Sequence, residues 1–172
     1  MMKANRHFLA YVALFVLFIA VWNIFFETAF VDVESASMMP ALYPVDSFLM
    51  FRYAPLSRHS IVVLDDPKNP NIKLIKRIIG LPGEAIQMRH GRIFINNVPV
   101  SEPYITEAYR SQETEPVWAP LLIPDRHYYV LGDNRSFSRD SREFGAIHRS
   151  AIHGRVIAVI APRENRKIFW SY

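Results

Sequence analysis

The sequence predicts a mostly β fold: one β-rich domain carried by a single N-terminal helix long enough to cross a membrane. An apolar segment with a single polar residue, Asn23, occupies residues 8–26. Beyond it, short runs rich in Val, Ile, Phe and Tyr alternate with Pro, Gly and Asn, which is typical of strands and turns. The chain has 172 residues, a length that suits one domain and an anchor. We therefore expect a short N-terminus at 1–7, a transmembrane helix at 8–26 and a folded domain at 30–172.

The apolar segment reads FLAYVALFVLFIAVWNIFF and contains no charged side chain. A helix needs about 20 apolar residues to span the hydrocarbon core of a bilayer. A cleaved secretory signal is the alternative, but its apolar core usually has about 7–15 residues and ends at a small-x-small site. The following ETAFVDV offers no convincing site of that kind. Lys3 and Arg6 precede the segment, and positive charge stays on the cytoplasmic side, so we expect an uncleaved anchor with the domain outside.

Seven runs of the domain have the composition of strands. They are SFLMFR (47–52), IVVLD (61–65), IKLIKRII (72–79), AIQM (85–88), RIFI (92–95), HYYVL (127–131) and RVIAVIA (155–161). His90-Gly91 and Asn96-Asn97 are short turn signals that predict a small meander over 85–100. Residues 101–125 carry four prolines and several glutamates, so we expect a long excursion across the surface.

Composition removes several classes of function. The chain contains no cysteine, which excludes disulfides, thiol nucleophiles and cysteine metal sites. Its formal charge is +4, but two of the basic residues, Lys3 and Arg6, precede the apolar segment, so the domain itself has only a small excess of positive charge. The domain also lacks a basic stripe with interleaved aromatic residues, which would mark a nucleic-acid site. The histidines are scattered and do not predict a metal site. We expect no cofactor, no metal and no nucleic-acid partner.

Lys76 lies where a strand would bury it. Alternation places Ile72, Leu74, Lys76 and Ile78 on one face of the run at 72–79. One interpretation is that the lysine stem covers apolar surface while the amine reaches water. The other is that burial desolvates the ammonium and lowers its pKa from about 10.4, by up to about 3–5 units. In that case the neutral amine can act as a general base near neutral pH.

The run SASMMPAL at 35–42 supplies candidate nucleophiles. If the segment is extended, Ser35 and Ser37 face the same way. A serine hydroxyl is a poor nucleophile until a base takes its proton, and Ser37 with a neutral Lys76 would form such a pair. Ser35 could then donate a hydrogen bond to the developing oxyanion beside a backbone N–H. The alternative is an ordinary polar turn after a membrane span.

Three blocks of the chain resemble the bacterial type I signal peptidases, which are membrane-anchored serine–lysine endopeptidases. SASMMPAL (35–42) is similar to the nucleophile block of that family, KRIIGLPGE (76–84) to its lysine block, and GDNRSFSRDSREFG (132–145) to its third block. The three blocks follow one N-terminal span in this order, and the match covers nearly the whole chain. The resemblance implies a signal-peptidase-like, β-rich catalytic domain on one transmembrane helix. It also implies a place in the bacterial cytoplasmic membrane, with the N-terminus in the cytoplasm.

The resemblance also implies roles for individual residues. Ser37 would be the nucleophile, Lys76 the general base, and Ser35 with the Ser37 amide the oxyanion site. Ser138 would hydrogen-bond the Lys76 amine and orient it. Four further residues would hold the site in place: Arg77, Asp133, Asp140 and Arg142. Arg77 would pair with Asp133.

The same resemblance implies partners. Met38 and Met39 would contact the membrane or the substrate, and the partners would be preproteins with signal peptides and the lipid bilayer, with the protein export machinery as a further candidate. Ala36 stands where the family more usually has glycine, and His59 and Ser60 replace a glycine-aspartate pair. Because these departures affect the expected substrate range, a peptidase dedicated to pilin maturation in conjugative transfer is an alternative. A non-catalytic membrane-tethered assembly or binding module is the alternative from another class.

Overall fold

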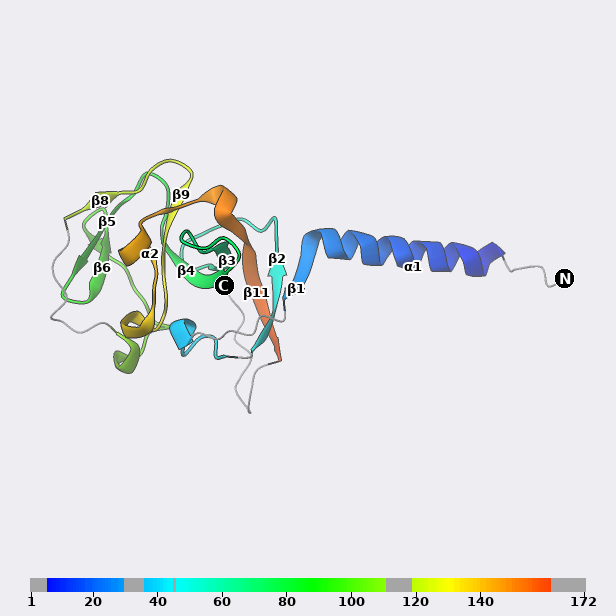
Figure 1. Cartoon of the computed structure of the whole chain (residues 1–172), viewed down its shortest axis with the longest axis horizontal. Helices are drawn as coiled ribbons and strands as arrows, with labels where there is room; N and C mark the ends of the chain where they lie inside the picture. The colour runs from blue at the N-terminus through cyan, green and yellow to red at the C-terminus, as the bar shows by residue number, and fades with distance from the viewer. Residues whose placement is uncertain (1–5, 30–35, 45, 111–118, 162–172) are drawn as a thin grey trace.

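The structure, a computed structural model, describes residues 6–29, 36–44, 46–110 and 119–161. A long helix, α1 (Arg6–Phe25), is followed by a β-rich body. α1 extends away from that body, in which the strands form two sheets (Figure 1). The predicted mostly β fold class is confirmed.

The larger sheet has seven strands in the described part of the chain, in the order β1-β2-β11-β3-β4-β9-β10. They are β1 (Phe26–Ala29), β2 (Ser47–Phe51), β3 (Ile61–Asp65), β4 (Lys73–Gly80), β9 (His127–Leu131), β10 (Ile147–His148) and β11 (Ile152–Ala161). Neighbouring strands are antiparallel. Val62 of β3 lies opposite Lys76 of β4, and Arg77 lies opposite Leu131 of β9. The sheet therefore places Lys76 on an inner strand, between β3 and β9.

The smaller sheet has the strand order β7-β6-β5-β8. Its strands are β5 (Ala85–Arg89), β6 (Arg92–Ile95), β7 (Val98–Pro99) and β8 (Leu121–Leu122). Both hairpin turns have positive φ at both central residues: 49° and 70° at His90 and Gly91, and 50° and 66° at Asn96 and Asn97. Turns of this kind match the twist of paired strands and favour Asn and Gly. The predicted meander over 85–100 is confirmed.

The predicted strands agree with the structure to within one residue, except at the start of β11. β11 begins three residues earlier than predicted, because its first residues pair with β3. The segment 101–125 is more than a surface excursion, since its end forms β8 against β5 and both Ile105 and Ile123 are buried. The remaining short elements are η1 (Ala36–Met38), η2 (Glu107–Tyr109), η3 (Arg135–Phe137), α2 (Ser141–Phe144) and η4 (Arg149–Ala151).

Three clusters of buried apolar side chains stabilise the body. The first packs Met38 of η1 against strands β2, β3, β4 and β11, and it lies beneath the η1 turn. The second contains Ile79 of β4 and Ile86 of β5, so it joins the two sheets. The third cluster lies on the opposite face of β3 from the first and includes Val62 of β3 and Ile78 of β4. Because each cluster includes a β4 residue, this strand is almost entirely buried after Leu74.

The side chains of α1 are described from His7 to Asn23, and those from Phe8 to Trp22 include many exposed large apolar groups. The helix ends at Phe25, one residue before the predicted end of the anchor, because Phe26 begins β1 and pairs with β2. Among the described residues, no helix has both the length and the apolar character needed to cross a membrane. The transmembrane helix at 8–26 stays a prediction.

Candidate active site

The segment that carries the predicted nucleophile is a tight turn. In η1, Met39 N donates to Ala36 O at 3.2 Å, and Leu42 N donates to Met38 O at 2.9 Å. The extended conformation considered for this segment is therefore wrong for residues 36–38. The turn directs Met38 fully into the core, so its predicted contact with membrane or substrate is wrong, whereas Met39 is partly exposed. Ser35 and its predicted oxyanion role lie outside the described residues.

Ser37 of η1 and Lys76 of β4 meet inside the protein. Ser37 is 3% exposed and Lys76 is 2% exposed. Lys76 Nζ lies 2.7 Å from Ser37 Oγ and donates to the backbone carbonyl of Ile75 at 2.9 Å. Burial thus decides between the two interpretations of the lysine, because its amine faces a hydroxyl and not the solvent. The fold brings together two residues that are 39 positions apart in the sequence.

Burial lowers the pKa of Lys76 from 10.5 to about 8. The carboxylates of Asp140 and Asp133 favour the ammonium and act against this shift, whereas the positive charge of Arg139 adds to it. With such a pKa, about one tenth of the lysines are neutral at pH 7. A neutral amine within hydrogen-bond reach of a serine hydroxyl can accept its proton.

Ser138 does not make the predicted hydrogen bond to the lysine amine. Its Oγ is buried and has no hydrogen-bond partner in the described part of the structure. The Lys76 amine is directed instead to Ser37 and to the Ile75 carbonyl. A Cβ placed on Gly132 would lie 2.1 Å from Ser138 Oγ and 2.6 Å from Ser37 O. Ser138 and Ser37 are therefore neighbours across Gly132, where only a glycine allows the segments to approach so closely.

Two ion pairs fix the loop that contains the third block. Arg77 binds Asp133 through two bonds, from Nε to Oδ1 at 2.8 Å and from Nη2 to Oδ2 at 2.6 Å. Asp140 accepts hydrogen bonds from the backbone N–H of Gly132 and from Arg142 Nε, both at 2.9 Å. Paired contacts of this kind between a guanidinium and a carboxylate are strong and directional. Because Arg77 follows the buried lysine in β4, the first pair ties the loop to the strand of the base.

Asn134 joins this loop to the nucleophile turn. Its backbone N–H donates to Ser37 O at 3.0 Å, and its Nδ2 donates to Ala36 O at 3.2 Å. Asn134 is buried, so both bonds are shielded from water. Sequence reasoning gave Asn134 no role, although its place next to Asp133 in the third block was an available signal.

A further buried ion pair was missed from the sequence. Arg135 binds Glu102, and its Nε donates to Gly132 O at 3.1 Å. The Tyr104 hydroxyl donates to Glu102 Oε1 at 3.2 Å, and its ring centroid lies 3.9 Å from Arg77 Cζ. Glu102 and Tyr104 belong to the segment predicted to cross the surface, so that prediction is wrong for them. Nothing in the local sequence distinguishes Glu102 from the other glutamates of that segment.

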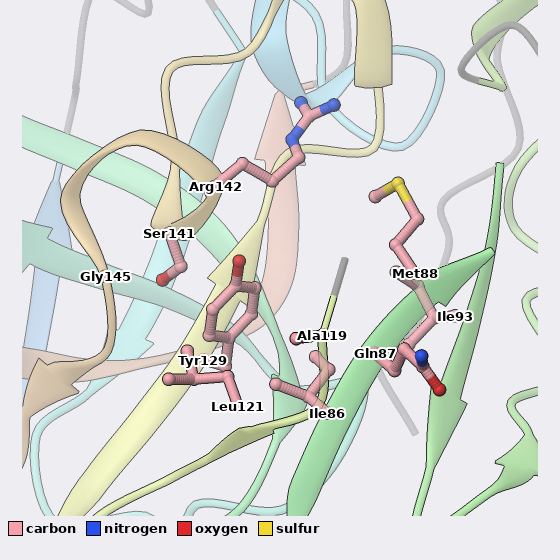
Figure 2. Close-up of a pocket in the computed structure, with 10 residues that line it drawn as sticks. All are labelled: Ile86, Gln87, Met88, Ile93, Ala119, Leu121, Tyr129, Ser141, Arg142 and Gly145. Carbon is pink, nitrogen blue, oxygen red and sulfur yellow. The ribbon is translucent and has the colours of Figure 1, made fainter. Parts of the chain in front are cut away.

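A cavity of about 290 Å³ lies beside the site, between the smaller sheet and the segment around α2 (Figure 2). It is lined by Ile86, Gln87, Met88, Ile93, Ala119, Leu121, Tyr129, Ser141, Arg142 and Gly145. Figure 2 shows the Tyr129 hydroxyl pointing toward the segment that carries Ser141 and Arg142, and burial raises the pKa of this phenol. Neither Ser37 nor Lys76 lines the cavity, so it is distinct from the place where a peptide would meet them.

The chemistry that this geometry supports is nucleophilic catalysis. It combines a buried hydroxyl, an amine of lowered pKa within 2.7 Å, and a loop held by ion pairs. Within the ranges that the structure describes, no group of three or more His, Cys, Asp or Glu side chains could hold a metal ion.

Comparisons with known proteins identify the family. Residues 4–161 match the family described as signal peptidase, peptidase S26. Signal peptidase I of Bacillus licheniformis is 34% identical over 145 residues, which cover 78% of each chain. Signal peptidase I V of Bacillus subtilis strain 168 is 34% identical over 169 residues, which cover 89% of this chain and 96% of the relative. The chain belongs to the signal peptidase family.

The fold agrees with that of a solved signal peptidase I. The crystal structure of the Enterococcus faecalis V583 protein matches with a TM-score of 0.51 and 29% identity, over 63% of this chain and 98% of that chain. The mitochondrial ATP-independent inner membrane protease subunit 1b of Arabidopsis thaliana is 32% identical over 134 residues, which cover 75% of this chain and 68% of the relative. The predicted family and its activity, a serine endopeptidase that cleaves signal peptides, are confirmed.

Proposed function

We propose that the protein removes N-terminal signal peptides from exported preproteins with Ser37 as nucleophile and Lys76 as general base. The observation that carries this proposal is the 2.7 Å distance between Lys76 Nζ and Ser37 Oγ, two atoms that belong to buried side chains. The lowered lysine pKa supplies the neutral amine at neutral to mildly alkaline pH. A preset geometry removes the entropy cost of bringing the two groups together.

In the first step, Lys76 Nζ takes the proton of Ser37 Oγ as this oxygen attacks the scissile carbonyl. A C–O bond forms, the carbonyl electron pair moves to the oxygen, and the amine becomes an ammonium. We assign stabilisation of the oxyanion to the Ser37 backbone N–H and the Ser35 hydroxyl. Breaking of the C–N bond then forms the acyl-enzyme, and the ammonium gives its proton to the leaving amine.

In the second step, water attacks the ester that links the acyl group to Ser37. Lys76 takes a proton from the water and returns it to Ser37 Oγ as the C–O bond of the ester breaks. One water and one peptide bond are consumed, and a new carboxylate and a new amine are released. The ion pairs Arg77–Asp133 and Arg142–Asp140 act as positioning groups in both steps, because they fix the loop next to Ser37 without touching the amine.

We assign α1 the role of the membrane anchor. The support for this role is the sequence: residues 8–26 carry no charge, and about 20 apolar residues in a helix are needed to span the hydrocarbon core of a bilayer. Large apolar side chains are exposed along it from Phe8 to Trp22, and in the sequence Lys3 and Arg6 precede the apolar run. The proposed location is the bacterial cytoplasmic membrane, with the N-terminus in the cytoplasm and residues 30–172 on the outer face. The bilayer is then a partner, and the export machinery is a candidate partner.

The proposal is tested with the full-length protein in detergent and a purified preprotein, with products identified by mass spectrometry. We expect Ser37→Ala and Lys76→Met to lower the cleavage rate by more than about a thousandfold. The matched controls are Ser101→Ala and Lys73→Met, two exposed positions of which the second shares β4 with Lys76. Both controls should cleave at the wild-type rate. Absence of cleavage by the wild type, or full cleavage by Ser37→Ala, rejects the proposal.

A further inference from the structure

Phe137, the last residue of η3, is the most exposed large apolar side chain of the described residues, with 78% of its surface accessible. A single exposed apolar side chain is ordinary on a soluble surface and by itself indicates nothing. Two further observations separate Phe137 from that background: the rigidity of its turn and the place of that turn.

The backbone on both sides of Phe137 is held firmly. Phe137 N donates to Asn134 O at 3.1 Å. Arg142 Nη2 donates to the carbonyl of Arg135 at 2.6 Å and to that of Ser138 at 3.3 Å, so one guanidinium spans the turn. The exposure of the phenyl ring is therefore imposed by a fixed backbone and does not result from a loose loop.

The turn lies directly against the nucleophile. Asn134 N donates to Ser37 O, and Ser138, the residue after Phe137, is the neighbour of Ser37 across Gly132. In Figure 1, η1 (cyan) and η3 (dark yellow) lie close together near the lower edge of the body, and α1 leaves the body at its right end. Next to Ser37, the side chain of Met38 is buried, whereas that of Phe137 is exposed. The apolar surface beside the nucleophile is therefore that of Phe137 and not that of Met38.

We propose that Phe137 binds an apolar side chain of the peptide substrate close to the scissile bond. This inference rests on the proposed function, because it places a peptide with its scissile carbonyl at Ser37 Oγ, next to the turn that carries Phe137. An extended peptide advances about 3.3 Å per residue, so only positions within a few residues of the cut come within reach of the ring. The ring carries no charge and offers no hydrogen bond, so the partner it selects is an apolar side chain. We take the partner to be a peptide and not a lipid because the η3 turn is bonded directly to the nucleophile turn, through Asn134 N and Ser37 O.

The test compares wild type and Phe137→Ala, as full-length proteins in detergent, on two soluble peptides that span a cleavage site. One peptide carries apolar side chains at the positions flanking the small residues before the cut, and in the other these are replaced by serine. We expect Phe137→Ala to lower kcat/KM about tenfold on the apolar peptide, mainly through KM, and less than about twofold on the serine peptide. Phe137→Leu should recover most of the loss. The matched control is Leu122→Ala, which removes another exposed apolar side chain from the smaller sheet and should leave both rates unchanged.

A small serine-directed phosphonylating reagent reports on the dyad itself. Its reaction rate with Ser37 should be unchanged in Phe137→Ala, because the phenyl ring does not contact the serine or the lysine in this proposal. Equal losses on both peptides, or a slower reaction with the reagent, would show a structural role and overturn the inference. A loss confined to precursors embedded in lipid vesicles would show a lipid contact and overturn it as well. If the wild type cleaves and Phe137→Ala behaves identically, only this inference fails, whereas a wild type that cleaves nothing removes the proposed function too.

Discussion

Replacing Lys76 by methionine should remove a specific pH dependence of stability. The folded lysine has a pKa of about 8 because it is buried, whereas the unfolded lysine titrates at about 10.5. Between these pH values the unfolded chain binds more protons than the folded protein, so this group makes the wild type more stable as the pH rises. Below pH 8 both states are protonated and the cost of burying the ammonium is fully present. From pH 7 to pH 10 the calculated gain is about 2.5 kcal/mol, at 1.36 kcal/mol per pKa unit.

The assay is the free energy of unfolding of wild type and Lys76→Met at pH 7 and pH 10, in the same detergent. Taking the difference between the two proteins cancels the groups that they share. We expect the wild type to gain about 2.5 kcal/mol relative to Lys76→Met over this range. Lys73→Met, which removes an exposed lysine from the same strand, should show no comparable gain. A difference that stays constant or shrinks as the pH rises would refute the argument that burial lowers the lysine pKa.

Three further outcomes are expected from the surroundings of the dyad and from the anchor. Asp133→Asn leaves the buried Arg77 without its carboxylate and should cost about 3–5 kcal/mol of stability, so an unchanged melting temperature would contradict the structural role of the pair. Asn134→Ala removes the side-chain bond to the nucleophile turn and should lower kcat about tenfold with KM unchanged; a change confined to KM would argue against positioning. Deletion of residues 1–25, which keeps β1 paired with β2, should reduce cleavage of membrane-inserted precursors more than that of soluble peptides. Equal losses on both would speak against an anchoring role.

The local sequence pattern was sufficient to predict most strands and to identify Lys76 as the candidate base. Strands such as β3 and β6 were predicted with their observed bounds, because β-branched and aromatic residues stand between clear turn signals. Lys76 was recognisable because period-two alternation placed it among aliphatic residues. The two-residue strands β7, β8 and β10 were not predicted, since so short an element is defined by its partner and not by its own composition.

Other features depend on contacts between distant parts of the chain. Glu102 is buried only because Arg135, 33 positions later, is brought against it. Met38 was expected at the surface beside a membrane span, but the η1 turn directs it into the core. Ser138 shows a different limit: the resemblance of the third block placed its hydroxyl on the Lys76 amine, whereas the structure places it beside Ser37 across Gly132, because side-chain directions are not specified by a sequence pattern.

The most direct test of the dyad is the pH profile of kcat/KM for the wild type on a soluble peptide, because this parameter reports the ionisation of the free enzyme. The rate should rise about tenfold for each pH unit below the lysine pKa and become level above pH 8 to 9. A profile that is flat from pH 6 to 9, or that still climbs tenfold per unit at pH 10, would contradict a buried Lys76 acting as the base.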